Sequence, residues 1–137
     1  MIAGAAAAII LSLLAVIHIY WAAGGTIGKA AAIPSRDSKP LFAPTPFTTI
    51  LVAFGLLAMA ALIAIKIGWI PAPGISTFAH VGLLLMAALF LLRAIGDFRY
   101  VGFFKRHRDS RFAKLDTVVY SPLCLLIACL ITVSANS

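Results

Sequence analysis

The chain has 137 residues, of which 63% are hydrophobic and only 11% are charged, and its mean hydropathy is +1.09. Soluble domains carry about 25% charged residues on a polar exterior, so this composition excludes a soluble globular protein and indicates a chain embedded in a membrane. The formal net charge of +7 does not point to a nucleic-acid partner, because no nucleic-acid-binding motif accompanies the basic residues.

Four apolar segments dominate the chain. A helix needs about 20 apolar residues to cross the hydrocarbon core of a bilayer, and segments at about 2–23, 47–66, 76–98 and 116–134 meet this requirement. They use most of the chain and leave no room for a separate soluble domain. We therefore predict an all-α integral membrane protein: one domain over residues 1–137, folded as a bundle of four transmembrane helices.

Basic residues are concentrated in the first and third of the predicted loops. With four spans these two loops lie on one side of the membrane and both termini lie on the other. Because basic loops stay in the cytoplasm, both termini are predicted to be outside. The same charges could attract anionic lipid headgroups, although their role in setting topology is a sufficient explanation. The two loops contain Lys29, Arg36, Lys39, Lys105, Arg106, Arg108, Arg111 and Lys114, against Lys66 alone on the opposite side.

The first predicted span ends with a group of polar and aromatic residues. His18 and Trp21 are three residues apart and share a helix face, whereas Tyr20 points elsewhere. Trp and Tyr at a span end commonly lie at headgroup level. His18 lies deeper, and it is either a structural hydrogen-bonding group or a member of a polar site. The sequence leaves both roles open for His18, and for Trp21 it leaves open a place in the interfacial aromatic belt or in the polar site.

A long connection, residues 24–44, separates the first two spans. Connections of this length in a compact domain are usually either functional or disordered. We expect a surface linker, and a lid over the end of the bundle is the alternative. The second span begins at Thr45 and Pro46, where a capping side chain is followed by a proline that needs no backbone partner. The rest of this span is apolar scaffold.

The strongest candidate for a functional site is the string Arg-Ala-Ile-Gly-Asp-Phe-Arg-Tyr-Val-Gly-Phe-Phe-Lys at 93–105. If the third helix continues to residue 98, Arg93 and Asp97 are four residues apart and can pair, and Tyr100 continues the same face. Ionisable groups at membrane depth usually face the bundle interior or a polar cavity. Asp116 and Tyr120 have the same spacing at the start of the fourth span, where Pro122 is predicted to kink the helix.

All four spans bring these polar side chains to one end of the bundle. Such a cluster can lock the helices together, form a pocket that opens to the cytoplasm, or dock a partner. In a pocket, Arg93 could hold a carboxylate or phosphate, and His18 with Asp97 or Asp116 could form an acid–base pair. The spacing does not suggest a metal site, and catalytic residues and cofactors stay unassigned. The candidate cluster is His18, Trp21, Arg93, Asp97, Tyr100, Asp116 and Tyr120.

Three parts of the chain together resemble a known family. They are the His-Ile-Tyr-Trp-Ala-Ala-Gly-Gly stretch at 18–25, the string at 93–105 and Tyr-Ser-Pro at 120–122. The resemblance is to small bacterial four-helix membrane proteins catalogued as domain of unknown function 3995. It implies a multi-pass protein of the bacterial inner membrane, and it brings no activity, substrate or catalytic residue.

Two hypotheses of different classes follow. In the first, the polar cluster is a cytoplasmic-side pocket for a small or lipid-like ligand, with Arg93 as the anion anchor. In the second, the protein is an accessory or assembly subunit of a larger membrane complex, or a homo-oligomer. Transport is a weaker third hypothesis, because the opposite half of the bundle is nearly free of polar side chains.

Overall fold

The computed structural model describes the backbone of residues 1–137 and every side chain except those of Ser76 and Thr77. Four helical segments are long and apolar enough to cross a membrane, which confirms the predicted all-helical fold. They are α1 (Ile2–Ala22), α2 (Pro46–Lys66), α3 (Ser76–Ile95), and a composite segment that consists of α4 (Arg111–Leu115), the π-helical turn η2 (Asp116–Tyr120) and α5 (Ser121–Ala135).

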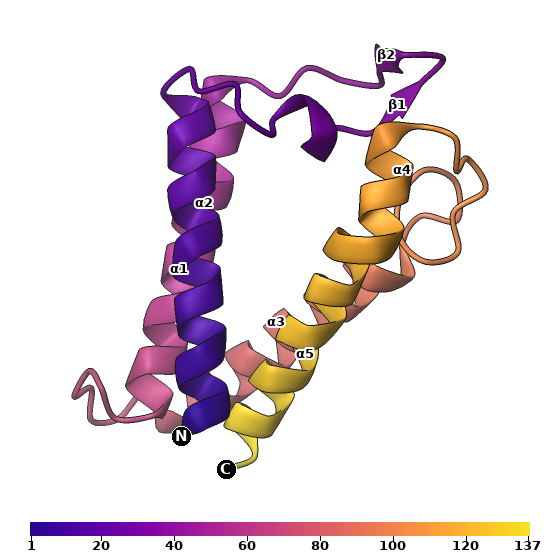
Figure 1. Ribbon diagram of the computed structural model, residues 1–137. Helices are drawn as coiled ribbons and strands as arrows, with labels where there is room; N and C mark the ends of the chain where they lie inside the picture. The colour runs from indigo at the N-terminus through magenta and orange to yellow at the C-terminus, as the bar shows by residue number, and fades with distance from the viewer.

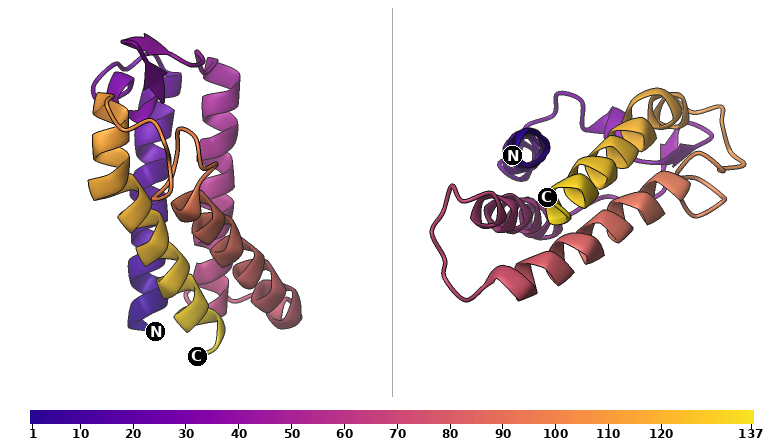
Figure 2. Two further views of the ribbon diagram at one scale, coloured as in Figure 1. Left: turned by 90° about the vertical axis from the view of Figure 1, so that its right-hand side faces the viewer. Right: turned by 90° about the horizontal axis from the view of Figure 1, so that it is seen from below.

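The helices form two pairs that are arranged as a V (Figure 1). Helix α1 lies beside α2, and α3 lies beside α5; Figure 2 shows both pairs from two further directions. The pairs meet near the two chain termini and diverge toward the loops that carry most of the basic residues. We call these the terminal end and the basic end. The basic end holds residues 23–45 and the third loop, residues 96–110.

The apolar core joins the two pairs in the half of the molecule nearer the terminal end. Its fully buried members include Leu11, Ile63, Leu83 and Ile127. Small residues let the backbones approach, which is how helices associate where lipid replaces water. A Cβ atom added at Gly4 would lie 2.5 Å from Ile67 Cγ2 and 2.7 Å from Ser134 Oγ. The terminal end is therefore the closely packed part of the bundle.

Two helix boundaries differ from the prediction. Helix α3 ends at Ile95 rather than at 98, because Gly96 has a φ of +90° and the chain turns back on itself. The Phe103 N–H donates to the Ala94 carbonyl over 2.8 Å and so closes this turn. The last helical segment begins at Arg111 rather than at 116, since Ser110 Oγ accepts a hydrogen bond from the Ala113 N–H. The predicted irregularity near Pro122 takes the form of the π-helical turn η2.

The first loop is an ordered strap rather than a plain linker. It contains a short 3₁₀ helix, η1 (Ala30–Ala32), and a hairpin in which β1 (Ser35–Arg36) pairs antiparallel with β2 (Lys39–Pro40). Figure 1 shows that it spans the basic end from one helix pair to the other. At the pair formed by α3 and α5, Tyr120 Oη of η2 donates to the Ala31 carbonyl over 3.1 Å. We call residues 23–45 the strap.

Candidate functional site

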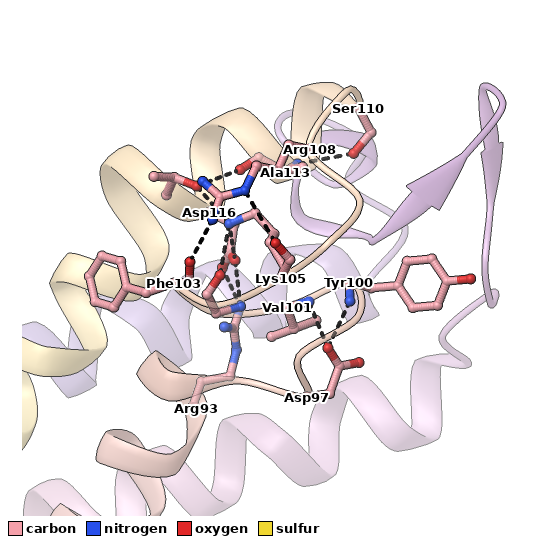
Figure 3. A network of polar contacts seen from close by, with 12 residues as sticks. Arg93, Asp97, Tyr100, Val101, Phe103, Lys105, Arg108, Ser110, Ala113 and Asp116 are labelled. Carbon is pink, nitrogen blue, oxygen red and sulfur yellow. Dashed lines mark hydrogen bonds and ion pairs between the residues drawn. The ribbon is translucent and has the colours of Figure 1, made fainter.

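A buried carboxylate, Asp116, is the centre of the polar network at the basic end (Figure 3). The residue has no exposed surface, and it receives hydrogen bonds from three donors. Arg93 Nη2 lies 2.9 Å from Oδ1, whereas Lys105 Nζ lies 3.1 Å and the Gly102 backbone nitrogen 2.7 Å from Oδ2. The carboxylate thus connects the end of α3 and the third loop to η2.

Lys105 is a member of this network that the candidate cluster predicted from the sequence leaves out, although it is the last residue of the candidate string at 93–105. Its side chain is fully buried, and Nζ also donates to the Gly102 carbonyl over 2.9 Å and to Thr117 Oγ1 over 2.6 Å. With Asp116, these acceptors satisfy all three ammonium donors, as a buried lysine requires. The sequence predicts Lys105 as one of the basic loop residues that set topology. The signal available in the sequence was its place directly after the apolar Val-Gly-Phe-Phe run, as the first charged residue before Arg106.

The expected ion pair between Arg93 and Asp97 is wrong. Because α3 ends at Ile95, Asp97 leaves the helical register, and Figure 3 shows the two side chains apart. Asp97 Oδ1 instead accepts from the backbone N–H groups of Arg99, Tyr100 and Val101 at 2.7–2.9 Å. Burial acts to raise the pKa of Asp97, but these N–H groups outweigh it and hold the pKa below 3.8. Asp97 therefore organises the third loop and does not neutralise Arg93.

Two predicted site residues, Tyr100 and Tyr120, have other partners. Tyr100 does not continue the face of Arg93: its ring stacks on His107 with 4.8 Å between ring centres, and Figure 3 shows it pointing away from Asp116. Tyr120 holds the strap through the Ala31 carbonyl. Neither tyrosine is among the residues that line the cavity described next.

A cavity of about 470 Å³ lies at the basic end, between the strap, the starts and ends of the helices, and Arg93. Its size falls within the usual range for small-molecule sites, about 300–1,000 Å³. Three predicted site residues, His18, Trp21 and Arg93, line it together. The other lining residues are Lys29, Ala32, Ile33, Phe42, Pro44, Thr48, Thr49 and Val52. The walls are thus mainly apolar, with a few polar groups.

His18 and Trp21 form one wall of this cavity. His18 Nδ1 lies 2.7 Å from the Leu14 carbonyl oxygen, which only accepts, so Nδ1 carries the proton and Nε2 of a neutral His18 is an acceptor. The two rings meet edge to face with centres 5.2 Å apart. Trp21 Nε1 donates to the Ile27 carbonyl over 2.8 Å, which ties the strap to α1.

Arg93 connects the buried network to the cavity. Its Nη2 binds Asp116, but its Nη1 is buried and has no hydrogen-bond partner among the described residues. Arg93 and Lys105 share the single carboxylate of Asp116, so the cluster carries one net positive charge. The Arg93 side chain is 35% exposed and lines the cavity, so this charge lies beside the cavity wall. The arrangement favours an anion there.

The acid–base pair suggested for His18 does not form. Asp97 is engaged by backbone N–H groups, Asp116 is engaged by Arg93, Lys105 and Gly102, and His18 bonds to the Leu14 carbonyl. Among the described residues, His, Cys, Asp and Glu side chains do not gather in a group of three or more that could hold a metal ion. The chemistry that this geometry supports is anion binding.

Four membrane-length helices in two pairs, with a charged network and a cavity at one end, define a small helical membrane protein. The chain belongs to the family described as protein of unknown function (DUF3995), whose model matches residues 11–131, and this confirms the resemblance predicted from the sequence. The matched region contains Arg93, Lys105 and Asp116. Searches of curated proteins and of solved structures found no match.

Proposed function

We propose that this protein binds a small or lipid-like anionic ligand in the cavity at the basic end, with Arg93 as the anion anchor. The observation that carries the proposal is the incomplete hydrogen bonding of the Arg93 guanidinium. One terminal guanidinium nitrogen, Nη2, is held by a carboxylate that Lys105 shares, the other, Nη1, is buried without a partner among the described residues, and the Arg93 side chain lines the cavity. An unsatisfied buried donor is costly, and a ligand oxygen on Nη1 would remove that cost.

The composition of the cavity supports an amphiphilic ligand. Guanidinium groups bind carboxylate and phosphate oxygens with short, charge-assisted hydrogen bonds. Beside Arg93 the cavity offers further cationic or polar groups from Lys29, His18 and Thr48, while Ile33 and Val52 contribute apolar wall. A molecule with an anionic head and an apolar body matches both parts.

The Asp116 network also acts as a lock between helices, and this role is compatible with binding. Lys105 and Gly102 hold the third loop against η2 through one carboxylate oxygen. Arg93 uses the other oxygen and extends from the lock to the cavity. Arg93 therefore takes part in both roles, whereas Lys105 and Gly102 belong to the lock and do not line the cavity, so substitutions at Lys105 test the lock without removing the anion anchor.

We further propose that the basic end faces the cytoplasm of a bacterial cell and that both termini lie outside the inner membrane. The basic residues of the strap and of the third loop favour this orientation. Exposed basic residues there, such as Arg99, Arg106 and Arg108, would also attract anionic headgroups. Lys105 does not take part, because it is buried in the Asp116 network.

The proposal is tested by what the protein retains when it is extracted gently from its own membrane. Small molecules released by organic solvent from the wild type are compared with those from Arg93→Gln and from Arg99→Gln, an exposed arginine outside the network. We expect an anionic molecule in wild type and Arg99→Gln that is at least about tenfold depleted in Arg93→Gln, as loss of a charge-assisted bond predicts. Equal retention by all three would contradict the proposal. Partner proteins at fixed ratio without such a molecule would favour an accessory subunit instead.

A further inference from the structure

We infer that the ligand reaches this cavity from the bilayer rather than from water. The ligand class is a membrane lipid with an anionic headgroup, which passes between α2 and α3 and places its headgroup on Arg93. This inference rests on the proposed function and names both the ligand class and its route.

The strap covers the side of the cavity that faces away from the helices. Five of the eleven lining residues belong to it, namely Lys29, Ala32, Ile33, Phe42 and Pro44. The cover is attached to both helix pairs. Trp21 Nε1 bonds to the Ile27 carbonyl on one side, and Tyr120 Oη bonds to the Ala31 carbonyl on the other. The strap, held by these two hydrogen bonds, therefore lies between the cavity and a solute that arrives from the aqueous phase.

Few side chains cover the flank of the cavity between α2 and α3. Among the described side chains, Arg93 alone represents α3 in the lining, and α5 contributes none. Helices α2 and α3 diverge toward the basic end in Figure 1 and in the right-hand view of Figure 2. Val52 of α2 lines the cavity and is still 48% exposed. One turn below Arg93 and on the same face of α3, Leu89 is 58% exposed. In a membrane, lipid chains contact these apolar surfaces.

The depth of Arg93 matches a lipid headgroup. It lies two residues before the end of α3, where the helix leaves the apolar region. Long cationic side chains at such positions keep their charged group at the interface and their stem along apolar surface. A lipid chain following Leu89 would bring its headgroup to the guanidinium. The net positive charge of the network with Lys29 nearby favours an anionic headgroup over a zwitterionic one, whose own cation would be repelled.

Trp21 provides a reporter inside the cavity. The chain has two tryptophans, so Trp69→Phe leaves Trp21 as the sole source of tryptophan fluorescence. The protein is placed in phosphatidylcholine nanodiscs with an increasing fraction of phosphatidylglycerol that carries brominated chains, which quench on contact. A matched series uses brominated phosphatidylcholine. A third adds 6-bromohexyl phosphate, a water-soluble phosphate ester with the same quencher.

We expect Trp21 quenching by brominated phosphatidylglycerol to saturate at a mole fraction about tenfold lower than with brominated phosphatidylcholine, a difference typical of one charge-assisted contact. Arg93→Gln should abolish this preference and Arg93→Lys should keep part of it. Arg99→Gln, which removes the same charge from the surface, should retain it. The Arg99 control separates a built site from general attraction of anionic lipid to a basic protein.

Two results would overturn the inference and leave the proposed function standing. Saturable quenching by 6-bromohexyl phosphate without a preference for brominated phosphatidylglycerol would show that the ligand comes from water. The second result has two parts: the two brominated lipids quench equally, and an anionic molecule co-purifies only when Arg93 is present. It would show that the cavity selects a ligand other than an anionic membrane lipid. Quenching that never saturates with any probe, with nothing co-purifying, would end both proposals.

Discussion

Asp116 is a single carboxylate that accepts hydrogen bonds from a guanidinium, an ammonium and a backbone N–H. Two cations are thus held near the interior by one anion, and one of them, Lys105, has no exposed side-chain surface. Breaking a buried ion pair by removing one partner is strongly destabilising, because the remaining charge is left without compensation. At this position the cost should exceed that of any surface substitution.

Asp116→Asn is expected to lower the free energy of unfolding by about 3–5 kcal/mol, measured by reversible unfolding in mixed micelles. The matched control is Asp109→Asn, an exposed carboxylate in the third loop, which should change stability by less than about 0.5 kcal/mol. Similar stabilities for the two variants would show that the Asp116 network does not hold the fold.

Asp97 gives the third loop a pH dependence. Its folded-state pKa lies below the ordinary 3.8, because the backbone N–H groups of residues 99–101 outweigh the effect of burial. A depressed pKa stabilises the ionised, folded loop, so this contribution is fully present above pH 4 and is lost as the pH falls through the folded-state value. We expect the amide resonances of Arg99, Tyr100 and Val101 to shift together with a midpoint below 3.8. Asp97→Asn should abolish that transition. A midpoint at or above 3.8 would be inconsistent with hydrogen bonds from the N–H groups of residues 99–101 to an ionised Asp97.

The third loop, residues 96–110, is the element on which the site depends. Gly96 and Gly102 both have positive φ, and a Cβ atom on Gly102 would overlap the Ile95 carbonyl and Gly96. This close approach turns the Gly102 N–H and Lys105 toward Asp116. The loop therefore places two of the three donors in the network.

Gly102→Ala should destabilise the protein by about 1–3 kcal/mol, because the left-handed backbone and the crowding act together. Gly24→Ala is the control: Gly24 also has positive φ, but nothing lies within 4 Å of an added Cβ atom. Gly24→Ala should therefore cost less in the same unfolding assay. Equal losses would mean that backbone conformation alone, and not the contact with Gly96, matters at residue 102.

The helices could be predicted from the sequence because long apolar runs leave few alternatives in a membrane. The boundaries at Ile95 and Arg111 could not, since they depend on local turns and on the Ser110 cap. The error at Ile95 produced the wrong partner for Arg93, because a pairing four residues apart requires a continuous helix. The hairpin was missed because each strand has two residues, and its turn uses Asp37 and Ser38 at positive φ, where Asn-Gly is the usual signal.

The whole molecule is a V whose core lies toward the terminal end and whose Asp116 network and cavity lie at the basic end. The sequence predicted this one-sided clustering, because each span carries its polar residues near the same end. It could not predict how the cluster divides. His18, Trp21 and Arg93 line the cavity, and Asp116 with Lys105 locks the loop to η2. Tertiary contacts between residues far apart in the chain decide that division.

The central claim is that Arg93 holds an anionic ligand at the cavity wall. Native mass spectrometry of the protein, extracted gently from its own membrane, tests it most directly. We predict one discrete added mass, that of a single lipid or metabolite, on the wild type and on Arg99→Gln, and its absence from Arg93→Gln while that variant still inserts and folds. An Arg93→Gln protein that carries the same added mass as the wild type would contradict the claim.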